Sequence, residues 1–309
     1  MPSYSLTPRA RSLRSRRRLA SVGFTLTEVL VVIAILAILA ALGTVGVMRA
    51  MDTARQSRIK IEVDNLDAAL KDYKAQFGSY PPCDFRTSDP IAFAALRSHV
   101  ARRFPRYNLN NLAADLGQTG LDLTNFRPDQ ALVFWLKGSS PDVTNPFVDL
   151  NGNQLVNGTP GTQMKITPLF EFDVNRLVPL TAGTHPSYVP PGSKNNAPYV
   201  YFDGAWLTQR FNATQDIPWD PSPYVTEGTP GLVRAYYTDT NNDKMVTLGT
   251  DQFINMDSCQ LIAPGLDGKY SSLAATAYPL YPLGTPFDLT YDDNIANFCE
   301  RARLGDAKP

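Results

Sequence analysis

A run of 20 residues without a charge, Val29–Met48, limits this chain more than any other feature of its sequence. A helix of that length rises about 30 Å, which is enough to cross the hydrocarbon core of a bilayer. The run is longer than the apolar core of a secretory signal peptide, and no small-residue cleavage site ends it cleanly. On hydropathy alone, an ordinary signal anchor is the simplest interpretation.

The charges that flank this run predict its orientation. Six of the 29 Lys and Arg residues lie within residues 1–23, which contain no Asp or Glu. Cations on this flank favour a cytoplasmic N-terminus and send the chain after Met48 outward. Without this segment, 23 cations face 29 acids, so the rest of the chain has a net charge of −6. A surplus of acid argues against a nucleic-acid-binding body, whose phosphate contacts need a basic face.

The junction before the apolar run contains a Gly23-Phe24 step and, four residues after Phe24, a lone carboxylate, Glu28. A charge at the centre of a bilayer costs roughly 2.5–3.5 kcal/mol on insertion scales, and less near its edge. A carboxylate in such a place usually has a partner and a function.

Residues 23–42, GFTLTEVLVVIAILAILAAL, closely resemble the cleavage and methylation motif of type IV prepilins and type II secretion pseudopilins. The resemblance implies that prepilin peptidase cuts after Gly23 and methylates the new N-terminal residue, Phe24. It also implies that Glu28 pairs with the N-terminal amine of a neighbouring subunit during assembly. An ammonium and a carboxylate that are each costly in lipid offset one another when they are paired.

Two departures from the family pattern stand out. The leader, residues 1–23, is longer than the short basic leaders of many members. Most members also have a proline where Val45 stands, between Gly43 and Gly46. Each glycine loosens a helix by roughly 1 kcal/mol relative to alanine, which makes this a softer version of the proline break.

After the membrane helix, residues 24–48, the pattern predicts an amphipathic helix over residues 49–78. Gly78 and the Pro81-Pro82 pair end it. Unbroken from Phe24 to Phe77, the helix is about 81 Å long, so its outer half must dock on a globular domain. Its apolar stripe follows helical spacing: Ile59, Val63, Leu66, Leu70, Tyr73 and Phe77.

The helix exit, residues 66–81, resembles the end of the long helix in the major pseudopilin of type II secretion. The resemblance rests on Tyr73-Lys74 and on the Gly78-x-Tyr80-Pro81 ending. The same aromatic residues are also explained as core residues that close a helix C-terminus, and neither interpretation suggests chemistry.

For residues 79–309 the sequence predicts an extracytoplasmic, pilin-like globular domain with a long loop-rich insertion at about 83–235. Helix first and short strands later indicate an α+β fold, in which the long N-terminal helix packs on a C-terminal antiparallel sheet. Residues 91–103 are predicted as a helix. The predicted strands are Ala131–Lys137, Leu169–Phe172, Tyr199–Phe202 and Val233–Tyr237.

Two acid-rich segments are candidates for Ca²⁺ binding. Residues 239–243 read D-x-N-x-D, the opening of a calcium loop, but Lys244 replaces the turn glycine and Thr250 the bidentate Glu. A solvated turn between two strands is therefore the preferred interpretation of this segment.

The second acid-rich segment lies at the tail, where residues 260–270 and 291–298 resemble the C-terminal loop of major pseudopilins. The resemblance implies a calcium site formed by Asp267, Asp292 and Asp293 with backbone carbonyls, and Phe298 takes the place of the family's aromatic residue. The alternative is that Gly268 makes a tight hairpin and the aspartates are merely exposed.

The three cysteines, Cys83, Cys259 and Cys299, form no CxxC pair and allow at most one intramolecular bridge. A pilin usually closes its C-terminal loop with a disulfide. That family pattern implies a possible Cys259–Cys299 bridge, which an extracytoplasmic compartment permits.

The sequence predicts that the protein is not an enzyme. No G-x-S-x-G, H-E-x-x-H, phosphate-binding or dinucleotide-binding motif is present in it. The rival from the enzyme class is a membrane-tethered secreted hydrolase that uses Asp292 and Asp293 as acid and base, but neighbours in sequence usually point apart.

The resemblance implies a structural subunit of a pseudopilus that drives type II protein secretion. Its expected partners are prepilin peptidase, other pseudopilin subunits in a homo- and hetero-oligomeric fibre, and the inner-membrane assembly platform, with no nucleic acid. The expected location is the inner membrane, crossed once, with the N-terminus cytoplasmic and the body periplasmic. The alternative is a surface type IV pilin for adhesion, motility or DNA uptake.

Overall fold

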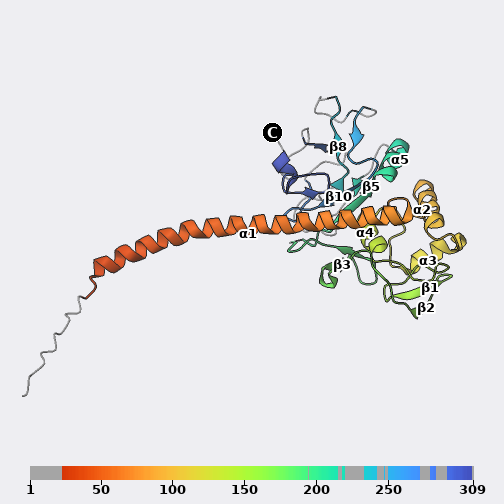
Figure 1. The fold of residues 1–309 in the computed structure, drawn as a ribbon, viewed down its shortest axis with the longest axis horizontal. Coiled ribbons are helices and arrows are strands. Elements are labelled where there is room, and N and C mark those ends of the chain that lie inside the picture. The colour runs from red at the N-terminus through yellow and green to blue at the C-terminus, as the bar shows by residue number, and fades with distance from the viewer. Residues whose placement is uncertain are drawn as a thin grey trace, which may run out of the picture. The chain divides into compact units, whose positions relative to one another are not determined.

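The computed structural model describes residues 23–193, 195–214, 218–219, 233–241, 247, 250–271, 279–282 and 291–307. By its internal contacts the chain divides into two compact units, Met1–Ala50 and Met51–Pro309. Helix α1 (Leu26–Phe77) contributes residues to both of them (Figure 1). The predicted leader lies outside the described residues except for Gly23.

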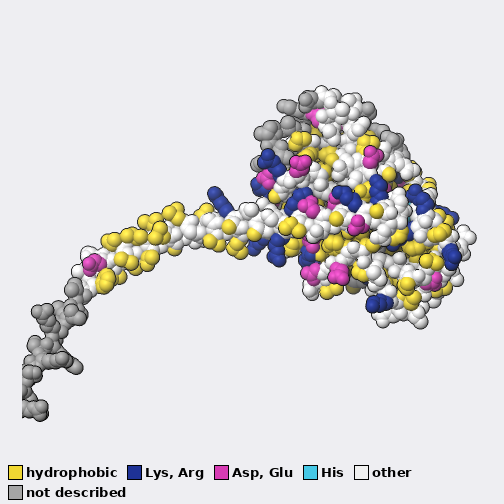
Figure 2. All heavy atoms as spheres, in the orientation of Figure 1, with side chains coloured by type: hydrophobic (Ala, Val, Ile, Leu, Met, Phe, Trp, Pro, Cys, Tyr) yellow, Lys and Arg dark blue, Asp and Glu magenta, His cyan; other side chains and the backbone are white. Residues whose placement is uncertain are grey.

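In the first unit, α1 is apolar on every side. Its large hydrophobic side chains up to Met48 are between 48% and 81% exposed, and Figure 2 shows them along the helix. The helix continues through Gly43, Val45 and Gly46 without interruption. Gly43 and Gly46 therefore do not interrupt the helix.

In the second unit, α1 has the predicted stripe. Ile59, Val63, Leu66, Leu70 and Tyr73 are buried, which confirms the amphipathic pattern, and Phe77 is partly buried. The helix ends where the sequence places its stop. Gly78 has a φ of +82°, a conformation that glycine adopts without strain, and its N–H donates to the carbonyl of Lys74 at 2.8 Å.

The sheet on which this helix packs has the strand order β12-β10-β5, and both pairings are antiparallel. Its strands are β5 (Val200–Asp203), β10 (Cys259–Ala263) and β12 (Ile295–Ala296). The buried carboxylate of Asp67 on α1 accepts a hydrogen bond from the amide of Asn297, at 2.7 Å, and the oxygen of that amide accepts from the N–H of Leu261 at 3.0 Å. The α+β class and the helix-on-sheet arrangement are therefore confirmed.

The other strands among the described residues are short and form four small sheets. A mainly exposed hairpin pairs β1 (Asn153–Val156) with β2 (Thr159–Gln163), and β3 (Leu177–Pro179) pairs with β4 (Pro186–Tyr188). The strand β6 (Pro218–Trp219) pairs with β7 (Val233–Arg234). The strand β8 (Tyr237–Thr238) lies between β9 (Gln252–Phe253), antiparallel, and β11 (Leu280–Tyr281), parallel. The predicted strand at 199–202 corresponds to β5, and the one at 233–237 divides into β7 and β8.

The other α-helices lie near the C-terminal end of α1 (Figure 1). Figure 1 shows β5, β8, β10 and α5 on one side of it, and β1, β2, β3, α3 and α4 on the other. The prediction at 91–103 is confirmed by α2, whose N-cap residue Asp89 accepts from the N–H groups of Ile91 and Ala92. The α-helices are α2 (Pro90–Arg103), α3 (Leu112–Gln118), α4 (Pro128–Leu136) and α5 (Gly204–Thr214), and the 3-10 helices are η1 (Leu109–Asn111), η2 (Val174–Arg176) and η3 (Leu304–Ala307).

Two strand predictions are wrong. Residues 131–137, predicted as a strand, lie in α4 and the residue that caps it. A short apolar run has no clear period, and Pro128 at the first turn favours a helix. Residues 169–172 form no strand either. The N–H groups of Leu169 and Phe170 donate to the carbonyl of Leu136, at 2.9 and 3.2 Å, so this segment satisfies the C-terminus of α4.

Candidate functional site

The predicted processing junction lies just before α1. Gly23 and Phe24 are not helical, and Phe24 is 80% exposed. A Cβ added at Gly23 would meet no atom within 4 Å. The structure therefore leaves the Gly23–Phe24 peptide bond accessible, and the fold itself does not require glycine at this position.

Thr25 and Glu28 form a reciprocal cap at the start of α1. The backbone N–H of Thr25 donates to Glu28 Oε2 at 2.8 Å, and the N–H of Glu28 donates to Thr25 Oγ1 at 3.3 Å. The hydroxyl of Thr25 also donates to Oε2, at 2.8 Å. This is a capping box, and its T-x-x-E spacing is readable in the sequence. The resemblance implies only an intermolecular role for Glu28, so this local role is a finding of the structure.

The apolar part of α1 gives the junction its setting. Among the described residues, α1 is the one helix whose length and composition suffice to cross a membrane. None of the 18 residues in its most apolar window is buried by the rest of the chain. The side chains of this segment are thus available to lipid or to other helices.

In the acidic tail, two of the three predicted calcium ligands lie together. Asp267 follows Gly265 in a tight turn that the N–H of Gly268 closes by donating to the carbonyl of Gly265, at 3.2 Å. The N–H of Asp267 donates to Asp293 Oδ2 at 3.3 Å. Burial and the nearby charge of Asp267 raise the pKa of Asp293 to about 6. A side chain at Gly265 would overlap the Asp293 carboxyl group, so glycine permits this close approach.

Asp292, the third predicted ligand, is packed differently. A Cβ at Gly305 would come within 2.9 Å of the carboxyl carbon of Asp292, and the N–H of Gly305 donates to the carbonyl of Asp292. The described part of the chain contains no group of three or more Asp, Glu, His or Cys side chains placed to hold a metal ion. The pair of Asp267 and Asp293 fits a hard cation in its chemistry but supplies few of the six to eight oxygens that Ca²⁺ takes. Calcium binding therefore stays a prediction.

The last two residues of the upstream D-x-N-x-D segment, 242 and 243, lie outside the described residues. Lys244, which follows them, also lies outside. Close to this segment, the carboxylate of Asp251 accepts from the N–H groups of Thr240 and Thr247, at 2.8 and 2.7 Å. Phe298 packs on Tyr236 and Tyr281, each at 5.3 Å between ring centroids, as a core aromatic residue would.

All three cysteines are buried free thiols in this structure. The Sγ atom of Cys259 lies 3.7 Å from Asp67 Oδ1, and that of Cys299 lies 3.3 Å from the carbonyl oxygen of Arg303. The Cys259–Cys299 bridge is thus not formed here, and the pairing stays a prediction.

A part-buried polar cluster that the sequence did not predict joins α1 to the body. Glu62 accepts from Arg176 at 2.7 Å, from Tyr188 at 2.8 Å and from Tyr199 at 2.5 Å. Burial opposes ionisation of Glu62, but the hydrogen bonds from Arg176 and the two tyrosines outweigh it and lower its pKa. Spacings of more than 100 residues separate Glu62 from these partners, so no local pattern could have indicated the cluster.

Comparison with known proteins finds a match at the N-terminal end of the chain. The family model of the prokaryotic N-terminal methylation motif matches residues 23–44. No curated protein and no solved structure matches the chain. The match supports the type IV pilin-like and pseudopilin-like family, processing by prepilin peptidase, assembly with other pilin-type subunits and single-pass membrane anchoring. It also indicates a structural subunit rather than an enzyme.

Proposed function

We propose that this protein is a structural subunit of the pseudopilus that drives type II protein secretion. The observation that carries the proposal is the methylation motif at residues 23–44, which continues into a helix with apolar side chains exposed on all sides. Prepilin peptidase cuts the Gly23–Phe24 bond and methylates the amine of Phe24. The helices of successive subunits then bundle into a fibre whose growth pushes folded proteins through the outer membrane.

The physics of the helix supports this sequence of events. A monomer can keep the exposed side chains of residues 24–48 away from water only in a bilayer. Leaving the bilayer requires an equally apolar environment, and the corresponding helices of other subunits provide it. Glu28 then meets the ammonium group of a neighbouring Phe24, and each charge offsets the cost of burying the other.

The charge distribution supports an orientation. The six arginines before Gly23 favour a cytoplasmic N-terminus at the inner membrane, with residues 51–309 in the periplasm. In this orientation the leader faces the cytoplasm, where we place contact with the assembly platform.

The end of α1 favours a pseudopilus over a surface pilus. Tyr80 and Pro81 of the Gly-x-Tyr-Pro ending pack into the body. The Tyr80 hydroxyl lies 3.0 Å from Ser258 Oγ, and the hydroxyl of Tyr201 donates to the carbonyl of Pro81 at 2.8 Å. This ending and the Asp267–Asp293 pair support the pseudopilin assignment, because both resemble the major pseudopilin.

Processing gives the first test. In cells that make prepilin peptidase, mature protein should begin at methylated Phe24, and Gly23→Ala should accumulate as precursor. Gly46→Ala is the matched control, because a Cβ at either glycine meets nothing within 4 Å. Intact-mass analysis of membrane fractions distinguishes the two forms. Retention of residues 1–23 in assembled wild-type material would refute the proposal.

Secretion gives the second test. Deletion of the gene should leave the exported proteins in the periplasm, and the wild-type gene, but not Gly23→Ala, should restore their release. Normal export together with the loss of fibres from the cell surface would instead identify a surface pilin.

A further inference from the structure

Arg103, in the last turn of α2, is a cation among aromatic rings with no acidic partner. Its guanidinium carbon lies 4.1 Å from the ring centroid of Phe77, 4.7 Å from that of Tyr73 and 5.4 Å from that of Trp135. Its Nη1 donates to the hydroxyl of Tyr73 at 2.6 Å. Among the residues that the structure describes, no carboxylate lies within 4.0 Å of this guanidinium.

Three other part-buried or buried arginines of the body are paired with carboxylates. Arg127 holds Asp129 with two hydrogen bonds, at 2.8 and 2.5 Å, and Arg86 holds Asp84 in the same bidentate way. Arg176 is paired with Glu62. Removing a guanidinium ion from water is costly unless an anion or a full set of acceptors replaces the water. The lack of a carboxylate at Arg103 therefore needs an explanation.

The interactions that Arg103 does make account for only part of its binding capacity. The aromatic rings and the C-terminus of α2 both favour a cation at this point. However, Nε is buried without an acceptor. Nη2 also donates to no described residue and, unlike Nε, is not fully buried. Nη2 is therefore a donor of the guanidinium group that is not fully buried and has no acceptor among the described residues.

Arg103 lines a surface groove of about 300 Å³ between the end of α1 and residues 138–141 and 165–169. The two charged residues that line the groove, Arg103 and Lys165, are both cations. Ser139 and Ser140 also line it, and Ser140 Oγ accepts the N–H of Asp142 at 3.1 Å, which leaves its hydroxyl hydrogen free to donate.

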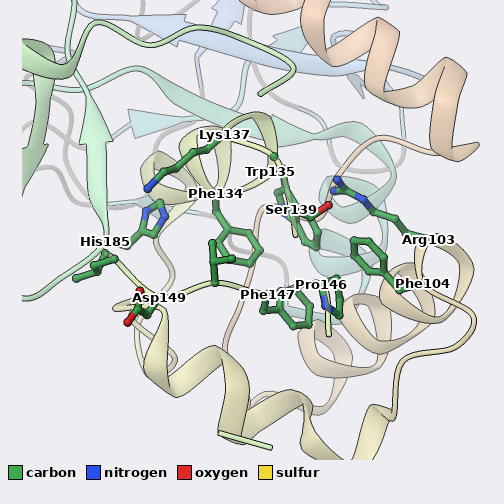
Figure 3. Close-up of a pocket in the computed structure, with 13 residues that line it drawn as sticks. Arg103, Phe104, Phe134, Trp135, Lys137, Ser139, Pro146, Phe147, Asp149 and His185 are labelled. Carbon is green, nitrogen blue, oxygen red and sulfur yellow. The ribbon is translucent and has the colours of Figure 1, made fainter. Parts of the chain in front are cut away.

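A small cavity of about 30 Å³ adjoins the groove and shares Arg103, Gly138 and Ser139 with it. Figure 3 shows Arg103, Phe104, Trp135 and Ser139 at one end of this cavity and His185, Lys137 and Asp149 at the other. The carboxylate of Asp149 accepts three hydrogen bonds from Asn151 and Asn153 in its own turn. The acid in this cavity is therefore already engaged elsewhere.

We propose that the groove binds a carboxylate group, held by Arg103 and the hydroxyl groups of Ser139 and Ser140, with Lys165 as an exposed second cation. A carboxylate suits the site better than a phosphate does, because one part-buried cation is balanced by one negative charge. A carboxylate oxygen can also accept a charge-assisted hydrogen bond from Nη2, which is stronger than one between neutral groups. The carboxylate belongs either to a small organic acid or to an acidic side chain of a polypeptide.

The test uses the full chain in detergent, titrated at constant ionic strength with sodium propionate, with a blocked Glu-containing tripeptide, and with inorganic phosphate. Binding is followed by calorimetry and by the side-chain NMR signal of the arginine Nε–H groups. We expect both carboxylates to bind and to shift one arginine signal, and phosphate to bind more weakly. Tighter binding of the tripeptide than of propionate would identify a polypeptide as the source of the carboxylate, and the reverse order a small acid.

Variants assign the effect to the groove. Arg103→Met should weaken carboxylate binding about ten- to a hundredfold, which is the effect of losing a charged hydrogen bond. Arg106→Met, which removes an exposed arginine three residues away, is the matched control and should leave binding unchanged. If Arg103→Met does not fold, two other variants provide the same test. Arg103→Lys removes the guanidinium group but keeps the charge, and Ser139→Ala removes one hydroxyl donor.

Three results would overturn the proposal: no binding of either carboxylate by the wild type, equal binding by Arg103→Met, or tighter binding of phosphate. None of these results depends on processing or assembly. The carboxylate proposal can therefore be refuted without affecting the proposed function, and the reverse is also true. A lower melting temperature of Arg103→Met together with no carboxylate binding by the wild type would show that Arg103 only holds the aromatic rings together.

Discussion

Glu28 caps the start of α1, and we propose a second task for it in assembly. In the single subunit its carboxylate accepts hydrogen bonds from the N–H and hydroxyl of Thr25. In the fibre we propose that it also faces the methylated amine of a neighbouring Phe24. A carboxylate has about four acceptor positions, so the cap and the intermolecular pair are compatible. The cap holds the carboxylate beside the residue that follows Phe24, which orients it before assembly.

This arrangement separates the two tasks in an experiment. Glu28→Leu should insert into the membrane, since it removes a charge from an apolar helix, but should fail to enter fibres alongside wild-type subunits. Thr25→Ala removes the cap, at a cost of about 0.5–2 kcal/mol for the helix end, but keeps the carboxylate and should still assemble. Copurification with tagged wild-type subunits measures incorporation. Normal incorporation of Glu28→Leu would show that the carboxylate has no role in assembly.

At this scale the sequence was informative only where the site is local. Gly23, Phe24 and Glu28 lie within six residues, so one motif predicts a role for all three. Glu62 and its partner Arg176 are 114 residues apart, and the bond between them exists only after the body has folded. For Arg103 the sequence predicts only a place in a helix, because a single sequence does not indicate which arginine has no carboxylate partner in the folded protein.

Among the elements, those with a clear period were predicted best. The stripe from Ile59 to Tyr73 repeats at helical spacing because one face of α1 packs on the body. The helix α4 was mistaken for a strand because Leu132 and Val133 are buried along with nearly all of its other residues, which removes the periodicity. For such elements the capping pattern is a better guide than hydropathy.

The contact between the turn after β10 and the segment before β12 gives a prediction at the scale of these elements. If Asp267 and Asp293 bind Ca²⁺, the ion links the turn after β10 to the segment that enters β12. A ligand at a hundred times its dissociation constant stabilises the folded form by about 2.7 kcal/mol. The unit Met51–Pro309 should therefore melt roughly 5 °C or more higher in calcium than in chelator.

Variants make the calcium prediction specific. Asp267→Ala and Asp293→Ala should each remove most of the calcium-dependent shift, and magnesium should stabilise the wild type less. If Asp292→Ala removes the shift as well, all three predicted ligands take part. Equal melting temperatures of the wild type in calcium and in chelator would exclude the site.

At the scale of the whole body, stability depends on pH through two groups of opposite charge, the buried His99 and the partly buried Asp203. His99 is 2% exposed and lies 2.7 Å from the hydroxyl of Tyr73. Burial and the charges of Arg103 and Arg102 lower its pKa to about 3. Asp203 accepts from the N–H of Ala205 at the start of α5. Burial raises the pKa of Asp203 to about 7, although its hydrogen bonds oppose the rise.

The signs follow from comparing each folded pKa with its unfolded value. The folded pKa of His99 is below its unfolded value of 6.5, so its contribution to stability is complete above pH 6.5 and is lost as the pH falls toward 3. The folded pKa of Asp203 is above its unfolded value of 3.8, so its contribution is complete below about pH 4 and is lost as the pH rises through 7. Between pH 4 and 6.5 the two groups therefore oppose one another.

Single substitutions should separate the contributions of His99 and Asp203 to the pH dependence of stability. Relative to wild type, His99→Gln should gain stability as the pH falls from 6.5 to 4, and Asp203→Asn should gain stability as the pH rises from 5 to 8. Each relative gain is limited to about 1.4 kcal/mol per pH unit, the value for one proton. Urea unfolding of the unit Met51–Pro309 at half-unit pH steps measures both slopes. A pH profile of either variant that runs parallel to that of the wild type would mean that its group titrates alike in the folded and unfolded chain, and its burial would then not control stability.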